Sequence, residues 1–203
     1  MKVREVVNRI FLVTCRTSRA VADIFVRFQE YYESPKFRGK IFTSREFLKW
    51  YRKTFETEYH DGFEGFNIPS SVLTPFYNGL FDPLNKKEKA FLRAFRRKKM
   101  RFYIIGAAED DHTTLTHEIA HGLFFTNLTY RNEVILALGH SNLSRLYEFF
   151  KVEGYHPDVW VDEAHAYIVN DLPYLESRGV KVRGLHHTNE ILSALFDRFY
   201  KPL

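Results

Sequence analysis

The chain of 203 residues contains a single cysteine, Cys15. One cysteine excludes a disulfide framework within the chain and any zinc site built from several thiolates. Long apolar runs are also missing: the stretch Ile10–Val13 is too short for a secretory signal, and no other segment approaches a membrane span. Any metal site must therefore use histidines and carboxylates, and we expect a cytoplasmic protein with no membrane segment.

Internal repeats and low-complexity segments are absent as well, which excludes repeat architectures and long disordered linkers. Hydrophobic residues make up 45% of the chain and aromatic residues 17%, with 20 Phe and 12 Tyr. Such a composition is typical of a globular protein with an aromatic-rich core. The length fits one domain, or a catalytic domain with a modest extension.

Charge of one sign is only mildly in excess, with 30 Lys and Arg against 25 Asp and Glu and a net charge of +5. The densest basic cluster is Arg96–Lys99. Cations there would suit the carbonyl end of a helix that ends at this point, and we favour this structural interpretation. A patch that binds nucleic acid is the alternative.

Apolar periodicity, capping residues and breakers predict a helix-rich α+β chain. The segment 3–33 has helical spacing with a break near Thr17-Ser18, and Thr43 with Glu46 forms a capping box for a helix to Phe55. Residues 57–84 predict loops and short strands, and a helix begins at Asn85. A strand is expected at 100–107 and a short one at 180–182. Further helices are expected at about 113–125, 131–138, 143–151, 158–170 and 188–199.

The motif that carries chemistry is His117-Glu118-Ile119-Ala120-His121. Side chains four residues apart share one face of a helix, so His117 and His121 can bind one zinc ion together. Glu118 could then take a proton from water at the metal and return it to a leaving amine. Chance gives this HExxH pattern in about 3% of chains of this composition.

A catalytic zinc site needs a third protein ligand. The residues after His121, GLFFTN, lack the additional histidine of the longer HExxHxxGxxH pattern, so the third ligand must lie farther along the chain. The best candidate is Glu163 in the helical segment 158–170, and His165 is the competitor. Tyr167, one turn after Glu163, would either stabilise the oxyanion of the reaction or pack in the core, and both roles stay open.

HEIAH followed by a downstream DEAHAY helix resembles the zincin metallopeptidases of the gluzincin type, over about residues 100–170. The resemblance implies a zincin-like core at 100–203, with His117, His121 and Glu163 as metal ligands. It also implies a metal cleft between an edge strand and two helices. Arg101–Ile105 would be that edge strand and would bind an extended peptide through main-chain hydrogen bonds. Residues 1–99 would form a helical portion packed on this core, or the whole chain would be one domain.

We therefore expect a zinc-dependent hydrolase, specifically a metallopeptidase with Glu118 and Tyr167 as catalytic residues. The alternative is a catalytically weak zincin-fold protein with a binding or regulatory role, associated with nucleic acid through its basic cluster. The sequence leaves substrate specificity and oligomeric state open.

Overall fold

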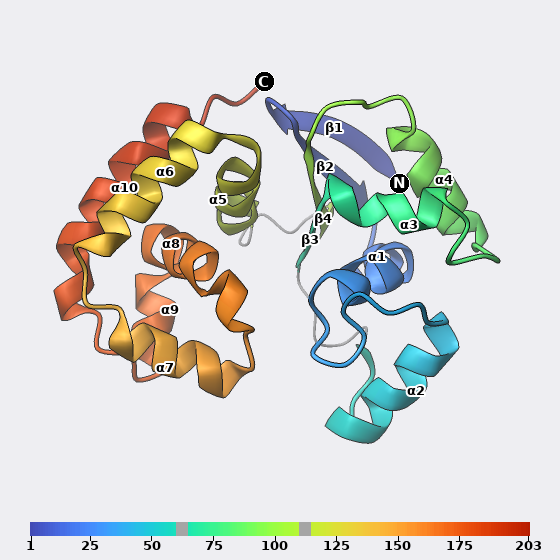
Figure 1. Ribbon diagram of the computed structural model, residues 1–203, viewed down its shortest axis with the longest axis horizontal. Coiled ribbons are helices and arrows are strands. Elements are labelled where there is room, and N and C mark those ends of the chain that lie inside the picture. Colours follow the sequence, from blue (N-terminus) through green and yellow to red (C-terminus); the bar gives the residue numbers. More distant parts are fainter. Residues whose placement is uncertain (60–64, 110–114) are drawn as a thin grey trace. The chain divides into compact units, whose positions relative to one another are not determined.

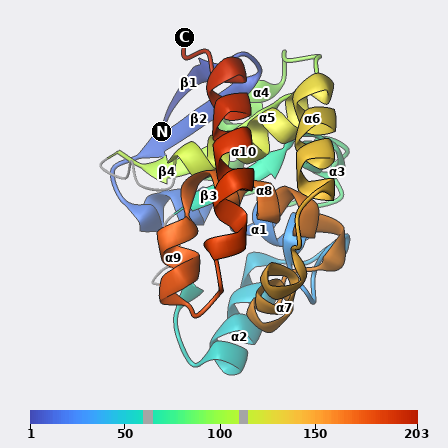
Figure 2. The same cartoon turned by 90° about the vertical axis from the view of Figure 1, so that its left-hand side faces the viewer.

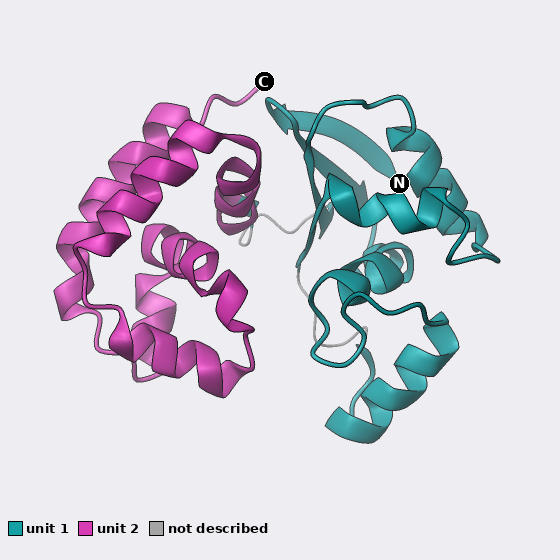
Figure 3. Cartoon of the chain, in the orientation of Figure 1, with its two compact units in different colours: residues 1–115 teal, residues 116–203 magenta. Residues whose placement is uncertain are grey.

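The computed structural model describes residues 1–59, 65–109 and 115–203 (Figure 1). It divides the chain into two compact units, residues 1–115 and 116–203 (Figure 3). Helices predominate and the strands form one small mixed sheet, so the predicted α+β class is confirmed. The first residues of the helix expected at about 113–125 lie outside the described residues.

Unit 1 is built on a four-stranded sheet in the order β1-β2-β4-β3. The strands are β1 (Lys2–Val7), β2 (Ile10–Cys15), β3 (Gly65–Pro69) and β4 (Tyr103–Ala108). β1 and β2 form an antiparallel hairpin, β2 and β4 are parallel, and β3 is antiparallel to β4. A parallel pair requires a long crossover, and here residues 16–102 connect β2 to β4.

The helices of unit 1 carry the phenylalanine-rich core. They are α1 (Ser18–Glu33), α2 (Ser44–Phe55), α3 (Thr74–Tyr77) and α4 (Lys86–Phe95), with a 3-10 turn at Ser70–Leu73. α1 contacts β2, β3 and β4 as well as α4. Phe25 and Phe28 of α1 meet Phe91 of α4 with ring centroids 5.1 and 4.8 Å apart. The capping box predicted at Thr43 is confirmed, and so is the helix start at Asn85, which forms a capping box with Glu88.

Unit 2 is helical in its described part. Its helices are α5 (Leu115–Thr126), α6 (Leu128–Gly139), α7 (Ser144–Glu153), α8 (Trp160–Asn170), α9 (Leu172–Ser177) and α10 (His186–Phe199). Helix α8 contacts α6, α7, α9 and α10, and α10 runs beside α6 (Figure 2). Ala164 and Ala166 of α8 are fully buried. Small side chains thus let the neighbouring helices approach α8 closely.

Several sequence-based predictions need correction. The segment 3–15 forms the hairpin β1–β2 instead of a helix, and only residues 18–33 are helical. β4 is paired on both sides, so the strand expected to be an edge is internal and residues 103–108 have no free main-chain edge. Residues 180–182 are irregular rather than a strand.

The division between the two units falls at 115/116, whereas the sequence suggested 99/100. β4 therefore belongs with the N-terminal unit, whose residues 1–99 contain three strands in addition to helices. Across the described ranges, no helix has both the length and the hydropathy needed to cross a bilayer.

Candidate metal centre

Helix α5 brings two imidazoles to one point. The Nε2 atoms of His117 and His121 lie 3.1 Å apart. Two nitrogens bound to one tetrahedral zinc at about 2.0–2.1 Å would be roughly 3.3 Å apart. The spacing of the pair is therefore close to that of a shared metal ion, as the one-turn separation on the helix predicts.

Helix α8 supplies the carboxylate. Oε2 of Glu163 lies 3.8 Å from Nε2 of His121. The candidate ligand atoms of His117, His121 and Glu163 all fall within 4.8 Å of one another. The structure thus brings together the three residues that the sequence predicts as ligands, from two helices about 40 residues apart in the chain.

His165, the competing third ligand, faces a different set of partners. It is fully buried, with Nε2 2.9 Å from the Tyr130 hydroxyl and Nδ1 3.0 Å from the main-chain oxygen of Asp162. Its ring also stacks on Phe124 of α5 at 5.4 Å. Both ring nitrogens of His165 are engaged within the protein, so Glu163 is the better third ligand.

Two further carboxylates, which the sequence interpretation missed, lie behind the histidine pair. Oδ2 of Asp171 is 2.6 Å from Nδ1 of His117, and Oδ1 of Asp162 is 2.9 Å from Nδ1 of His121. In metal sites a carboxylate on the outer imidazole nitrogen commonly fixes the ring and directs the other nitrogen toward the ion. The sequence offers one indication of Asp162, which directly precedes the candidate ligand Glu163. It offers none of Asp171, which follows the end of α8.

The charges around the pair favour a cation. Burial by itself would lower the pKa of His121, but the carboxylates of Asp162 and Glu163 outweigh burial and raise that pKa to about 10. Burial raises the pKa of Glu163 to about 7, against the opposing pull of the two imidazoles. Without a metal, the cluster thus retains protons close to where a divalent ion would be bound.

Glu118 is a buried residue of α5, next in sequence to His117. Its Oε2 atom has no hydrogen-bond partner among the described residues. An unsatisfied buried carboxylate oxygen is costly unless a water or ligand completes it. Together with a donor set of two imidazoles and one carboxylate, this oxygen fits a transition metal such as zinc with a water beside it.

Tyr167 lies at the edge of the cluster. Its ring meets His117 edge-on with centroids 5.0 Å apart, and its hydroxyl lies 3.0 Å from that of Tyr155. Burial raises the pKa of Tyr167, and the nearby carboxylate of Glu163 adds to the effect. The hydroxyl is therefore a hydrogen-bond donor at neutral pH.

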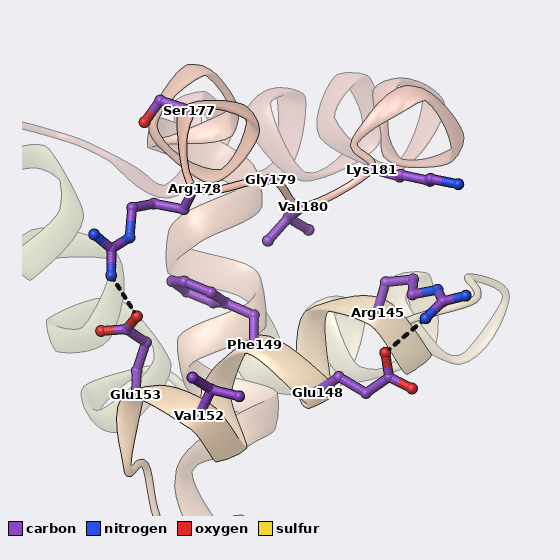
Figure 4. A pocket seen from close by; sticks show the side chains of 10 residues that line it. All are labelled: Arg145, Glu148, Phe149, Val152, Glu153, Ser177, Arg178, Gly179, Val180 and Lys181. Carbon is purple, nitrogen blue, oxygen red and sulfur yellow. Dashed lines mark hydrogen bonds and ion pairs between the residues drawn. The ribbon is translucent and has the colours of Figure 1, made fainter.

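A separate hollow of about 720 Å³ lies between α7 and the segment 177–181 (Figure 4). Arg145 pairs with Glu148 at 2.9 Å and Arg178 with Glu153 at 2.6 Å on its walls. Both carboxylates are neutralised by arginine, and the residues that line the hollow include none of the candidate metal ligands. This hollow is therefore distinct from the candidate metal centre.

Comparison with known proteins finds no match: no family model matches the sequence, and no curated protein and no solved structure is significantly similar to it.

Proposed function

We propose that the protein is a zinc-dependent hydrolase that cleaves peptide bonds with an activated water. The observation that carries the proposal is the convergence of His117, His121 and Glu163 within 4.8 Å, with Glu118 adjacent in sequence to the first ligand. Three protein ligands leave one position of a tetrahedral zinc site open, which is the arrangement of catalytic sites.

The roles of the side chains follow from this geometry. Zinc, when bound, would polarise the substrate carbonyl and lower the pKa of a coordinated water. Glu118 does not ligate; its carboxylate would accept the proton of that water and pass it to the leaving amine. Asp162 and Asp171 would hold the two imidazoles, and the protonated hydroxyl of Tyr167 would donate a hydrogen bond to the developing oxyanion.

The proposed substrate class is a peptide, on the resemblance of HEIAH and the later DEAHAY helix to gluzincins. The mode of binding that the resemblance implied does not hold, because residues 103–105 belong to a strand with partners on both sides. Recognition of the peptide must therefore use side chains or main chain other than an edge at β4.

Glu118→Gln separates chemistry from metal binding. The amide keeps the size of the carboxylate but cannot take a proton, so peptide hydrolysis should fall by at least about 100-fold with metal content unchanged. The measurements are metal content by mass spectrometry of protein purified without chelator, and cleavage of a fluorogenic peptide library.

His121→Ala is the matched variant, and should lose both metal and hydrolysis because it removes a ligand. Wild-type protein that binds no metal would contradict the metal centre. Protein with one bound metal but no hydrolysis of any peptide would contradict the peptidase assignment alone, and full activity in Glu118→Gln would contradict the role of that residue.

A further inference from the structure

The surface formed by α4 and the residues after it carries a dense positive charge. Residues 86–101 contain nine Lys and Arg and one acidic residue, Glu88. Glu88 is fully buried and bound in a bidentate pair by Arg27, with distances of 2.7 and 2.6 Å. All nine cations are exposed. We call them the α4 basic surface: Lys86, Lys87, Lys89, Arg93, Arg96, Arg97, Lys98, Lys99 and Arg101.

The stability of α4 does not explain the cations of its first turn, whereas Arg93 in the last turn and the residues after it suit the carbonyl end of the helix. The helix begins at Lys86, so Lys86, Lys87 and Lys89 lie in its first turn, where the helix dipole is positive. Cations at this end are unfavourable. Lys87 pairs with Asp23 at 2.6 Å. Within the described ranges, no carboxylate pairs with Lys86, Lys89, Arg93 or Arg96.

Part of the α4 basic surface lines a groove beside α4. It has a volume of about 510 Å³, and Lys89, Arg93 and Arg96 line one wall. The lining also includes one carboxylate, Asp82, and Tyr77, which is 42% exposed and whose hydroxyl donates to the main-chain oxygen of Leu92 at 2.8 Å. Three cations along one helix face and a fixed, accessible aromatic ring match a phosphate backbone with a base against the ring.

We propose that the α4 basic surface binds the phosphate backbone of nucleic acid. A helix that enters an anionic membrane needs a free apolar face, but Phe91, Leu92 and Phe95 of α4 are buried in the core of unit 1. The distribution of charge also favours unit 1 as the part that binds nucleic acid. Residues 1–115 hold 22 Lys and Arg against 14 Asp and Glu, and residues 116–203 hold 8 against 11. The inference does not depend on hydrolase activity.

The test is fluorescence anisotropy of the full chain with labelled oligonucleotides of about 20 nucleotides, at about 50 and 200 mM salt. Single-stranded RNA, single-stranded DNA and duplex DNA are separate arms. The test variant combines Lys89→Glu, Arg93→Glu and Arg96→Glu. The control combines Lys181→Glu, Arg183→Glu and Lys201→Glu, which are exposed residues of unit 2 and change the net charge equally.

We expect binding in at least one arm that weakens with salt. The α4 variant should lose about 30-fold or more in affinity, and the control less than about 3-fold. A neutral variant, with glutamine at the same three α4 positions, should reduce the slope of log affinity against log salt by roughly 2 to 3, since three phosphate contacts are lost.

Equal losses in the α4 and control variants would overturn the proposal, because net charge alone would then explain binding. So would the absence of binding in all three arms, or binding to vesicles that contain phosphatidylserine with none to nucleic acid. Unchanged thermal unfolding of each variant shows that the fold is retained. Glu118→Gln should bind nucleic acid as the wild type does, which separates this site from the metal centre.

Discussion

Each candidate histidine ligand uses its two ring nitrogens for different purposes. Nε2 of His117 and Nε2 of His121 face one another at 3.1 Å, while each Nδ1 faces an aspartate. In metal sites a carboxylate at Nδ1 fixes the orientation of the ring, so that Nε2 points toward the place a metal would take. Asp171 and Asp162 would therefore hold the two rings in the orientation that the proposed metal site requires.

Asp171→Asn should weaken zinc binding by about 10- to 100-fold, because an amide orients His117 but does not raise the basicity of the ring as a carboxylate does. Competition with a chromophoric chelator measures the affinity. Glu176→Gln, an exposed acidic residue of the adjoining helix α9, serves as the control for loss of one negative charge. Equal affinities of Asp171→Asn and Glu176→Gln would show that Asp171 does not support the ligand.

The sequence predicts the three candidate ligands but not the two aspartates beside the histidines, for a physical reason. The spacing of His117 and His121 is a local property of any helix, and a downstream glutamate on a second helix is a short pattern. Asp171 lies beyond the end of α8, at a position with no fixed spacing from the histidine it binds. Its role depends on how α5 and α8 pack, which periodicity does not encode.

At the scale of elements, the starts of helices are predicted best where the capping residues are close together in sequence, as at Thr43 and Asn85. The N-terminal segment failed because Val3, Val7 and Ile10 fit a helical spacing as well as a strand. The strand is stabilised by a partner far away in the sequence, because β2 pairs with β4 from Ile10–Tyr103 to Cys15–Ala108. The same pairing makes β4 internal, and no pattern within 100–107 could have shown it.

Gly106 of β4 tests how closely α1 packs on the sheet. A Cβ atom there would lie 2.6 Å from the ring of Phe25 and 2.9 Å from Val21. Gly106→Ala should destabilise the protein by about 1–3 kcal/mol through overpacking, as measured by urea unfolding. Gly139→Ala, where a Cβ meets nothing within 4 Å at the end of α6, should be neutral or slightly stabilising.

A second change distinguishes overpacking from other effects of Gly106→Ala. Phe25→Leu removes the ring that the new methyl group would meet, so the double variant should be less unstable than the two single losses predict when added. Strict additivity of the two changes would show that the methyl group and the ring do not interact.

For the whole molecule, the two compact units carry different chemistry. The candidate ligands, their two aspartates and Glu118 all belong to residues 116–203, and the α4 basic surface belongs to residues 1–115. A metal that joins α5 to α8 should therefore stabilise unit 2 specifically. Binding to the folded form at about 1,000 times the dissociation constant contributes about 4 kcal/mol.

Hydrogen exchange locates that contribution. Treatment with a chelator should speed amide exchange in α5 and α8, by up to about 1,000-fold where exchange requires unfolding of the unit. Amides of β2 and β4 should change little, because no candidate ligand lies on these strands. Glu118→Gln should respond to chelator as the wild type does, since it keeps the metal, and His121→Ala should exchange fast without chelator. If the chelator does not change the exchange rates in α5 and α8, no ion holds these helices together, and the proposal of a zinc-dependent hydrolase is contradicted.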